Sequence, residues 1–354
     1  MNNTFSEILL TWAASHLRPM PWKGIKNPYF IWLSEIILQQ TRVEQGLPYY
    51  LKFTKNYPTV KDLADAPEDD VMKCWEGLGY YSRARNLHAA AKYIAYDCEG
   101  IFPNTYDNLL KIKGVGNYTA SAIASFAFDL PYAVVDGNVY RVLSRIYGIA
   151  TPIDLPEGQN EFRNLANSLL DHTKPALYNQ AIMDFGATQC TPKSPLCASC
   201  SFNTICKAFL ENKTSILPVK SKKMVKKERF FNYFIFKNEE KTFIRKRVEK
   251  DIWQDLYEFP MVESEQLWTV ENLLELADFA ENIEKRHIKT SRPFKHVLTH
   301  QNLVAQFFEI EIKDDFVVKN TDWIVIFEKD LKKFAFPRLI DLFISEKSVS
   351  LTLF

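Results

Sequence analysis

A carboxylate inside an apolar helical segment is the first sign of chemistry in this sequence. In "SEIILQQTR", residues 34–42, Glu35 stands among isoleucines and leucines. Apolar residues at helical spacing predict a buried helix over residues 30–40. Burial disfavours the charged form of a carboxyl group and raises its pKa, so Glu35 can hold a proton near neutral pH and act as a general acid. A buried carboxylate with a purely structural role is the alternative.

Four of the six cysteines lie within one short segment, "CTPKSPLCASCSFNTIC". Their spacing is Cys190-x6-Cys197-x2-Cys200-x5-Cys206. Four thiolates in one loop can close a tetrahedral or cubane metal site. Structural zinc usually takes two C-x2-C pairs, and only one is present here. The spacing therefore favours a [4Fe–4S] cluster over zinc or free thiols.

A glycine turn in "KIKGVGNYT" follows the end of a predicted helix. Gly114 and Gly116 let the backbone approach a ligand closely, and a new helix begins near Asn117. The unpaired N–H groups at a helix N-terminus can hold a phosphate. Lys111 and Lys113 favour this reading, although glycines are also common in ordinary helix–turn–helix connections.

A second carboxylate stands at another predicted helix start, in "AVVDGNVYRVLSR", residues 133–145. Asp136 follows an apolar run and precedes Gly137 and Asn138. Aspartate is well suited to cap a helix N-terminus. Asp136 is therefore either a structural cap or a second catalytic carboxylate.

The predicted secondary structure that positions these residues divides the chain into two domains. With 354 residues and 47% hydrophobic content, the chain is long enough for two domains. Helical periodicity dominates residues 1–210, and strand signals are nearly absent there. Residues 211–229 are rich in lysine, which is typical of a solvated linker and is also compatible with contact to a nucleic-acid backbone.

The residue pattern changes near residue 230, where "RFFNYFIFKNEEKTFIRKR" predicts a strand, a polar turn and a second strand. Further strands are predicted at "NLVAQFFEIEI" and "TDWIVIFEK", and helices at "ENLLELADFAE" and "PRLIDLFISEK". Residues 230–354 are therefore predicted to form an α+β domain after an all-α domain. The net charge of +1 identifies no partner. No apolar run reaches the roughly 18 residues of a membrane span, so we expect a soluble intracellular protein.

Residues 1–210 resemble the helix–hairpin–helix DNA glycosylases that carry an iron–sulfur cluster. The likeness is strongest to the MutY adenine DNA glycosylase family, and it rests on "RPMPWK", "SEIILQQTRV", "GLGYYSRARNLH", "KGVGNYTASAI", "VDGNVYRVLSR" and the cysteine loop. Endonuclease III, a related family, carries a lysine where this chain has Tyr118 and lacks the acid found at Glu35. The resemblance implies one [4Fe–4S] cluster held by the four cysteines.

The second domain resembles the Nudix-like domain with which this family examines the base opposite adenine. "DIWQDLYEFPMVE" matches a core loop of that domain, and Leu298-Thr299-His300 stands where the family shows F-S-H. The resemblance implies that Thr299 and His300 contact the opposite base. An R-E-x-x-E-E run is absent, so magnesium-dependent Nudix hydrolysis is not expected.

The resemblance implies an adenine DNA glycosylase of base excision repair, which hydrolyses the N-glycosidic bond of adenine mispaired with 8-oxoguanine or guanine. Glu35 is then the general acid, and Asp136 stabilises the oxocarbenium-like sugar. Asn138 orients Asp136 and water, while Tyr118 positions the sugar or Asp136. Without a lysine at position 118, we expect a monofunctional enzyme that does not cut the strand.

Further DNA contacts follow from the same family motifs. The residues expected to bind DNA or the target base are Arg18, Trp22, Gln39, Gln40, Tyr80, Gly114, Gly116, Gln180, Thr299 and His300. Arg18 and Trp22 are expected to line the adenine pocket, with plain loop packing as the alternative. The amides that end the Glu35 helix can bond unpaired base edges. Tyr80 can wedge beside the mismatch or can be a core tyrosine.

The expected partner is double-stranded DNA that contains adenine opposite 8-oxoguanine or guanine, bound by a monomer without a membrane. The lack of an N-terminal extension favours a bacterial cytoplasmic enzyme. Two other functions compete with this reading. One is a non-catalytic damage-binding protein of the same fold, and the other is a relative that removes thymine or oxidised pyrimidines.

Overall fold

The chain, described from a computed structural model, folds into two compact units. The structure describes residues 2–16, 18–221, 226–276, 287–312 and 322–351. The first unit comprises Met1–Asp65 and Asn86–Lys223, and the second comprises Ala66–Arg85 and Met224–Phe354. A short segment from the helical part of the sequence thus belongs to the second unit.

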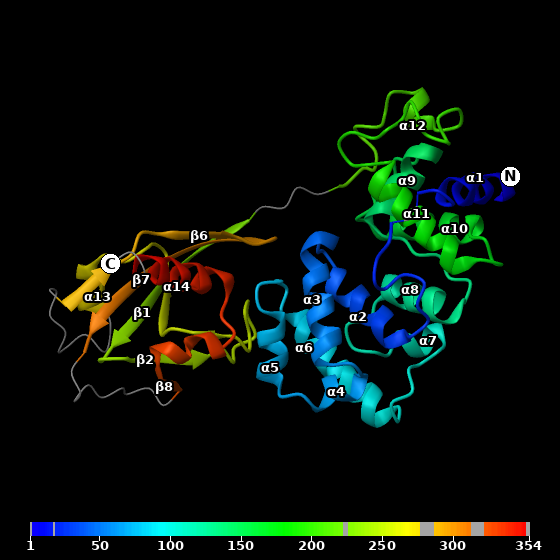
Figure 1. Cartoon of the computed structure of the whole chain (residues 1–354). Helices are drawn as coiled ribbons and strands as arrows, with labels where there is room; N and C mark the ends of the chain where they lie inside the picture. The colour runs from blue at the N-terminus through cyan, green and yellow to red at the C-terminus, as the bar shows by residue number, and fades with distance from the viewer. Residues whose placement is uncertain (1, 17, 222–225, 277–286, 313–321, 352–354) are drawn as a thin grey trace. The chain divides into compact units, whose positions relative to one another are not determined.

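The first unit is helical (Figure 1). Its elements are α1 (Asn2–Ala13), α2 (Pro28–Leu38), α3 (Val43–Asn56), α4 (Val60–Asp65), α6 (Ser82–Lys92, whose first four residues belong to the second unit), the π-helical turn η1 (Tyr93–Asp97), α7 (Tyr106–Leu109), α8 (Asn117–Phe128), α9 (Gly137–Tyr147), α10 (Pro156–Leu169), α11 (Pro175–Thr188) and α12 (Lys207–Leu210). The predicted all-α domain is confirmed.

Local signals explain where the helices that carry the candidate site begin and end. Asn27 caps α2 by accepting a hydrogen bond from the Tyr29 backbone N–H, and a proline occupies the first turn. Asp136 caps α9, which ends at Gly148 with φ of 70°. Helix α8 ends at Asp129, which also adopts a left-handed backbone.

The core of the first unit forms where α11 packs against α9 and α1. Phe185 of α11 meets Trp12 of α1 edge-on, with ring centroids 4.9 Å apart. The same ring also packs edge-on against Phe202 of the cysteine loop at 5.3 Å. One continuous apolar cluster therefore joins the N-terminal helix, the helix of Asp136 and the cysteine loop.

The second unit is built on two sheets. Its elements are α5 (Glu68–Trp75), β1 (Lys227–Lys237), β2 (Lys241–Lys246), β3 (Tyr257–Glu258), β4 (Met261–Ser264), α13 (Val270–Leu276), β5 (Ile288–Thr290), β6 (Phe294–Val297), β7 (Gln301–Glu311), β8 (Trp323–Phe327), the 3₁₀ turn η4 (Glu328–Lys333) and α14 (Arg338–Leu351). The larger sheet has the order β4-β1-β7-β5 with β6 also on β7, and the smaller has the order β3-β2-β8.

The centre of the larger sheet is the parallel pair β1 and β7, which runs in register from Lys227 opposite Gln301 to Lys237 opposite Glu311. Tyr233 stacks on Phe307 across this pair at 5.1 Å. The aromatic run in β1 thus fills the core, and the predicted α+β domain is confirmed. The predicted helix over 271–281 is described as α13, and residues 277–281 lie outside the described part.

The lysine-rich segment is described only in part. Ser221 donates backbone and hydroxyl hydrogen bonds to Asp154, and Val219 accepts one from the Ile153 backbone, so residues 219–221 are bound to the first unit. Residues 222–225, which include Lys222 and Lys223, lie outside the described residues. Among the described helices, none is long and apolar enough to cross a membrane.

Candidate active site

Glu35 is buried within α2, as the sequence predicts. Only 8% of the residue is exposed, and its neighbours Trp32, Leu33 and Ile37 are wholly buried. Burial raises the pKa of Glu35 from 4.5 to about 7. A hydrogen bond with Tyr118 opposes this shift, and the negative charge of Asp136 adds to it.

Tyr118 and Asp136 are therefore close enough to Glu35 to act on it electrostatically, so the structure gathers three of the predicted catalytic residues. Tyr118 lies in the first turn of α8. Burial, and then the charge of Glu35, raises the pKa of its phenol well above the ordinary value. Its hydroxyl is 3.6 Å from the Met183 sulfur. Tyr118 is thus a neutral phenol bonded to the candidate acid.

Asp136 is both the cap of α9 and a member of this group. Its Oδ1 accepts hydrogen bonds from the backbone N–H groups of Asn138 and Val139, at 2.9 and 2.8 Å, and its Oδ2 accepts one from the Asn138 amide at 2.7 Å. Burial raises the pKa of Asp136, while these bonds and the charge of Arg141 lower it. The two readings made from the sequence are compatible, because the capping geometry itself holds the carboxylate.

Arg141 holds the side-chain oxygen of Asn138, whose amide N–H donates to Asp136. Its Nη2 donates to the Asn138 side-chain oxygen at 2.8 Å and to the Gly186 carbonyl at 2.6 Å, and its Nε donates to the Cys190 carbonyl at 2.7 Å. A Cβ added at Gly186 would lie 2.6 Å from the Cβ of Asn138. Only glycine therefore lets α11 approach the first turn of α9 this closely.

The glycine turn has the predicted form. Gly114 has φ of 83°, a left-handed backbone that favours glycine, and Gly116 is the N-cap of α8. No atom outside the turn lies within 4 Å of a Cβ built at Gly116, so space is open beside the helix N-terminus. This opening suits a phosphate group, and Lys111 and Lys113 are both exposed nearby in the sequence.

Arg18 and Trp22 lie on the segment before α2. Arg18 donates through Nε and its backbone N–H to Asp184 of α11, at 3.1 and 3.3 Å. Lys23 binds both oxygens of the same carboxylate, whose side chain is wholly buried. The Trp22 ring packs edge-on against Tyr50 at 5.0 Å. The role of Arg18 and Trp22 in an adenine pocket stays a prediction.

The predicted amide contacts occupy three different settings. Gln39 is the C-cap of α2 and donates to the Thr119 hydroxyl at 3.2 Å. Gln40 is exposed and has a left-handed backbone with φ of 54°. Gln180 lies half-buried on α11. Gln40 is the amide of these three that the fold presents to solvent.

Tyr80, Thr299 and His300 belong to the second unit. The hydroxyls of Tyr80 and Thr299 are hydrogen bonded to each other, although the residues are 219 positions apart in sequence. Tyr80 is 44% exposed and has φ of 49°. His300 is exposed where β7 begins, and its carbonyl accepts a hydrogen bond from the Lys227 backbone. A core role for Tyr80 does not agree with this exposure.

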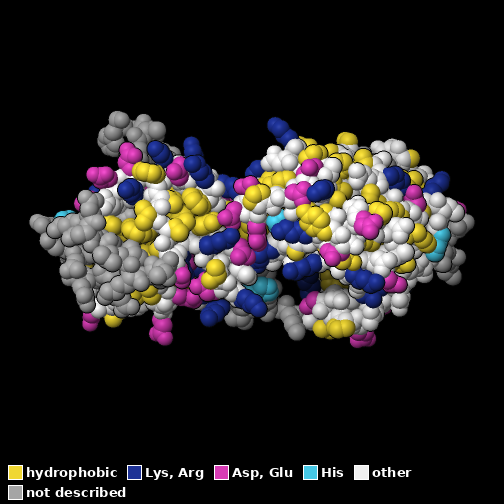
Figure 2. Space-filling model, turned by 90° about the horizontal axis from the view of Figure 1, so that it is seen from below, with side chains coloured by type: hydrophobic (Ala, Val, Ile, Leu, Met, Phe, Trp, Pro, Cys, Tyr) yellow, Lys and Arg dark blue, Asp and Glu magenta, His cyan; other side chains and the backbone are white. Residues whose placement is uncertain are grey.

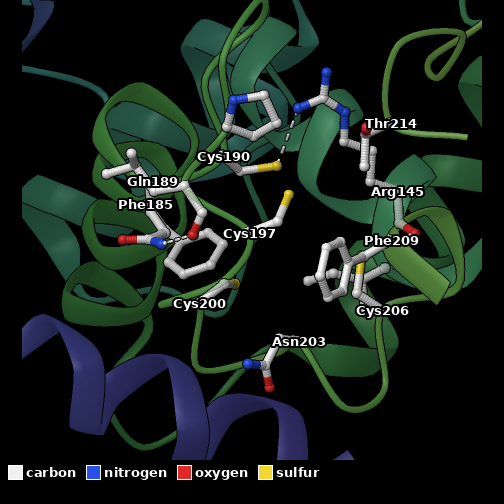
Figure 3. A pocket seen from close by; sticks show the side chains of 13 residues that line it. Arg145, Phe185, Gln189, Cys190, Cys197, Cys200, Asn203, Cys206, Phe209 and Thr214 are labelled. Atoms are coloured by element: carbon white, nitrogen blue, oxygen red, sulfur yellow. Dashed lines mark hydrogen bonds between the residues drawn. The ribbon is translucent and has the colours of Figure 1, made fainter. Parts of the chain in front are cut away.

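The four clustered cysteines line one pocket in the first unit, with about 350 Å³ of empty space that includes a part open to solvent. Figure 3 shows them around this pocket, with Arg145 bonded to Cys190. No three His, Cys, Asp or Glu side chains of the described residues are already arranged as a metal site. The pocket thus brings all four thiols to one place without closing them on a single point.

The pocket is chemically suited to thiolate ligands of a metal cluster. Burial raises the pKa of the Cys197, Cys200 and Cys206 thiols. A metal binds such residues as thiolates, so metal binding would release their protons. Arg145 donates to the Cys190 sulfur at 3.4 Å, and the Phe202 backbone N–H donates to the Cys200 sulfur at 3.4 Å. Such N–H groups stabilise charge on sulfur.

Charges of both signs are mixed on one face of the molecule. On the face shown in Figure 2, Lys and Arg side chains are interspersed with Asp and Glu. This pattern agrees with the net charge of +1. The glycine turn is one local group at which an anionic polymer could bind such a surface.

Sequence reasoning missed several residues that build the site. Asp184, Arg141 and Arg145 carry no local signal, because each acts on partners that are distant in sequence. Asn179 was also missed. It is fully buried on α11, accepts from the Val134 backbone at 3.1 Å, and thereby holds the segment that leads to Asp136. A polar residue within an apolar helix, as with Glu35, was the one signal that could have identified Asn179.

Comparison with known proteins gives a consistent picture across both units. The sequence profile described as "HhH-GPD superfamily base excision DNA repair protein" matches residues 33–167. The profile described as "NUDIX domain" matches residues 232–346. The first profile includes Glu35, the glycine turn and Asp136.

A curated adenine DNA glycosylase from Buchnera aphidicola (subspecies Acyrthosiphon pisum) is 34% identical over 316 residues, which cover 86% of this chain and 89% of that protein. Among solved structures, a thermostable thymine-DNA glycosylase is 29% identical, with a TM-score of 0.55 over 59% of this chain and 97% of that one. An endonuclease III in a non-covalent DNA complex is 21% identical, with a TM-score of 0.52 over 60% and 98%, and shows the shared fold.

Proposed function

The chain belongs to the MutY family of adenine DNA glycosylases, which act in base excision repair, and we propose that it removes adenine paired with 8-oxoguanine or guanine from double-stranded DNA. The observation that carries the proposal is a buried Glu35 with a pKa of about 7, which lies close enough to Asp136 for the negative charge of Asp136 to raise that pKa. Two carboxylates in unlike environments suit the cleavage of a glycosidic bond.

Protonation of the base is the first requirement of the reaction. Adenine leaves poorly as an anion, and the enzyme must extrude it from the duplex to reach it. With a pKa of about 7, Glu35 holds a proton in a large fraction of molecules at neutral pH. We assign Glu35 as the general acid that protonates the adenine ring at N7, which turns the base into a neutral leaving group.

Stabilisation of the sugar is the second requirement. As the bond to adenine breaks, positive charge develops on the sugar. The Asp136 carboxylate, held by three N–H bonds, stabilises this charge directly or by transient covalent attachment and then guides water to the anomeric carbon. Asn138 positions Asp136 through its own amide, and Arg141 holds the Asn138 oxygen.

Tyr118 makes the enzyme monofunctional. A phenol that stays neutral at physiological pH cannot form a Schiff base with the sugar, whereas a lysine at this place can. Tyr118 instead donates to Glu35 and orients it. The product is therefore an abasic site in an uncut strand.

The base opposite adenine is examined by the second unit. Tyr80 stands out from its loop and is bonded to Thr299, so the pair presents one aromatic face and two hydroxyls. An aromatic wedge can enter the stack beside a mismatch, and hydroxyls can bond base edges. Leu298 replaces the aromatic residue of the family motif, so we assign the polar contact to Thr299.

The cysteine pocket is proposed to hold one [4Fe–4S] cluster through Cys190, Cys197, Cys200 and Cys206. When bound, the cluster supplies four metal–thiolate bonds that tie the loop together. Arg145 anchors the same loop by donating to the carbonyls of Thr191 and Pro192 at 2.8 and 3.1 Å. The loop is thereby fixed to α9, the helix that Asp136 caps.

Single-turnover excision on labelled duplexes tests the proposal. The panel contains adenine opposite 8-oxoguanine, guanine or thymine, thymine opposite guanine, and thymine glycol, each with and without alkali. We expect alkali-dependent cleavage at adenine opposite 8-oxoguanine or guanine and none opposite thymine. Borohydride should trap no adduct with the wild-type chain.

The other outcomes are equally informative. Cleavage of only the thymine or thymine-glycol duplexes would place the chain among pyrimidine-removing enzymes of this fold. Strand breaks without alkali would contradict the role of Tyr118. Tight binding without excision would indicate a damage-binding protein. The Asp136→Asn variant serves as a matched inactive control, because it keeps the volume of the side chain and removes its charge.

A further inference from the structure

The loop that carries Tyr80 is held from both sides by groups of the second unit. Glu76 lies before Tyr80 and accepts a hydrogen bond from the Phe336 backbone N–H at 2.8 Å. Arg85 lies after it and donates to the Gln254 carbonyl at 2.7 Å. We call this pair of contacts, made by Glu76 and Arg85, the Tyr80 clamp.

Additional contacts support each side of the clamp. Lys73 bonds to Glu76 and donates to the Phe334 carbonyl at 2.7 Å. On the other side, Arg85 Nε lies 3.4 Å from an oxygen of Asp255. Asp255 itself adopts a left-handed backbone with φ of 65°, which is costly for a residue other than glycine. The backbone of Asp255 is therefore strained at the residue whose side chain contacts Arg85.

The loop inside the clamp has little regular structure of its own. Gly77, Gly79 and Tyr80 all have positive φ, at 89°, 80° and 49°. The Gly79 carbonyl accepts from Trp75 Nε1 and Arg83 Nη2 at 3.0 and 3.1 Å, which fixes the turn locally. The left-handed state at Tyr80 costs roughly 1 kcal/mol or more, so outside contacts must maintain it.

These facts point to a role in specificity. We propose that Glu76 and Arg85 are specificity-determining positioning residues, which hold Tyr80 beside Thr299 so that both meet the base opposite adenine as one rigid surface. The proposal rests on the proposed function. The clamp is bonded largely to backbone atoms, so it fixes position without itself presenting groups to a base. Rigid placement of a recognition group reduces the ordering cost of binding.

The clamp is separate from the chemistry. Glu35, Tyr118 and Asp136 all belong to the first unit, whereas Tyr80, Thr299 and the clamp belong to the second. The ion pair of Arg85 and Asp255, whose side chains are 22% and 20% exposed, lies within the second unit. Loss of the clamp should therefore reduce discrimination between opposite bases more than the rate of excision itself.

The Arg85→Ala variant tests the proposal in single-turnover excision of adenine opposite 8-oxoguanine and opposite guanine. We expect the ratio of the two rates to fall about tenfold, with the rate opposite guanine changed less than twofold. Asp255→Ala should lower the ratio less, since the Gln254 carbonyl remains, and should add nothing to Arg85→Ala. Arg292→Ala breaks an exposed ion pair with Glu346 in the same unit and is the matched control.

Hydrogen exchange of the DNA-free protein gives a second readout that does not depend on activity. Amides of residues 77–82 should exchange faster in Arg85→Ala than in the wild type, while those of α8 keep their rates. An equal loss of excision or DNA affinity for both duplexes would overturn the proposal, because Arg85 would then act on chemistry or on the DNA backbone. An unchanged ratio would also overturn it.

The same experiments separate this proposal from the proposed function. If the wild-type chain excises no mispaired adenine, the proposed function fails, and the specificity role of the clamp fails with it. Faster exchange in Arg85→Ala would in that case still support the structural clamp. If the wild type prefers 8-oxoguanine and Arg85→Ala keeps that preference, only the further inference fails.

Discussion

Replacing Glu35 with glutamine should stabilise the first unit at alkaline pH while it abolishes excision. A carboxylate with a pKa of about 7 in the folded chain, against an ordinary value of 4.5, binds its proton more tightly when folded. The proton therefore stabilises the fold fully below pH 4.5, and this contribution is lost as the pH rises through 7. At pH 8 and above, the contribution that Glu35 has lost to the free energy of unfolding is about 3 kcal/mol.

Glutamine has nearly the same shape and never ionises. The free energy of unfolding of Glu35→Gln, compared with the wild type, should therefore rise by about 3 kcal/mol between pH 4.5 and pH 8. Any constant cost of the new amide cancels in this comparison. The same variant should lose about 10²- to 10⁴-fold in excision rate, because no proton donor remains at the base.

Urea denaturation followed by the helical circular dichroism signal measures the first effect, since the first unit is helical throughout its named elements. Glu161→Gln, on the exposed face of α10, is the matched control for the replacement of a carboxylate by an amide. A constant difference between Glu35→Gln and wild type across this pH range would falsify the claim that burial raises the pKa. Substantial excision by the variant would refute the catalytic assignment.

Three further outcomes follow from the site. The single-turnover excision rate should fall about tenfold for each pH unit above 7, as Glu35 loses its proton, and a flat profile from pH 6 to 9 would contradict the general-acid role. Cys197→Ser should lower the iron content of the purified protein and its affinity for duplex DNA, whereas full iron content would exclude this thiol as a ligand. Gly186→Ala should lower excision at least tenfold with the helical content retained, because its Cβ would lie 2.6 Å from that of Asn138 and displace the start of α9. An active variant would show that α9 tolerates this shift.

The sequence was sufficient to predict features that depend on local pattern. The apolar run around Glu35 predicts a buried helix, and the structure places that residue in α2 with 8% exposure. The same holds for Asp136, whose position before a glycine and an asparagine predicts a helix cap. In each case the prediction depends only on the residue and its immediate neighbours in the sequence.

Contacts between residues that are far apart in the sequence leave no local pattern from which they could be predicted. Asp184 binds Lys23 across 161 positions, and nothing in "MDFG" shows that this aspartate will be wholly buried with two cations. The segment Ala66–Arg85 was likewise expected with its helical neighbours. An amphipathic helix such as α5 shows which face it buries, but its periodicity does not specify the unit that covers it.

Glu35 and Asp136 have different surroundings, which suit the different roles proposed for the two carboxylates. Burial raises the pKa of both, but Asp136 accepts three N–H hydrogen bonds and lies near Arg141, and each of these lowers its pKa. A hydrogen bond with Tyr118 lowers the pKa of Glu35, whereas burial and the negative charge of Asp136 raise it. The pKa of Glu35 is raised to about 7, so Glu35 can hold a proton near neutral pH, as the proposed general acid requires. The capping bonds of α9 and the charge of Arg141 oppose the effect of burial and favour the anionic form of Asp136, in keeping with its proposed role beside a positively charged sugar.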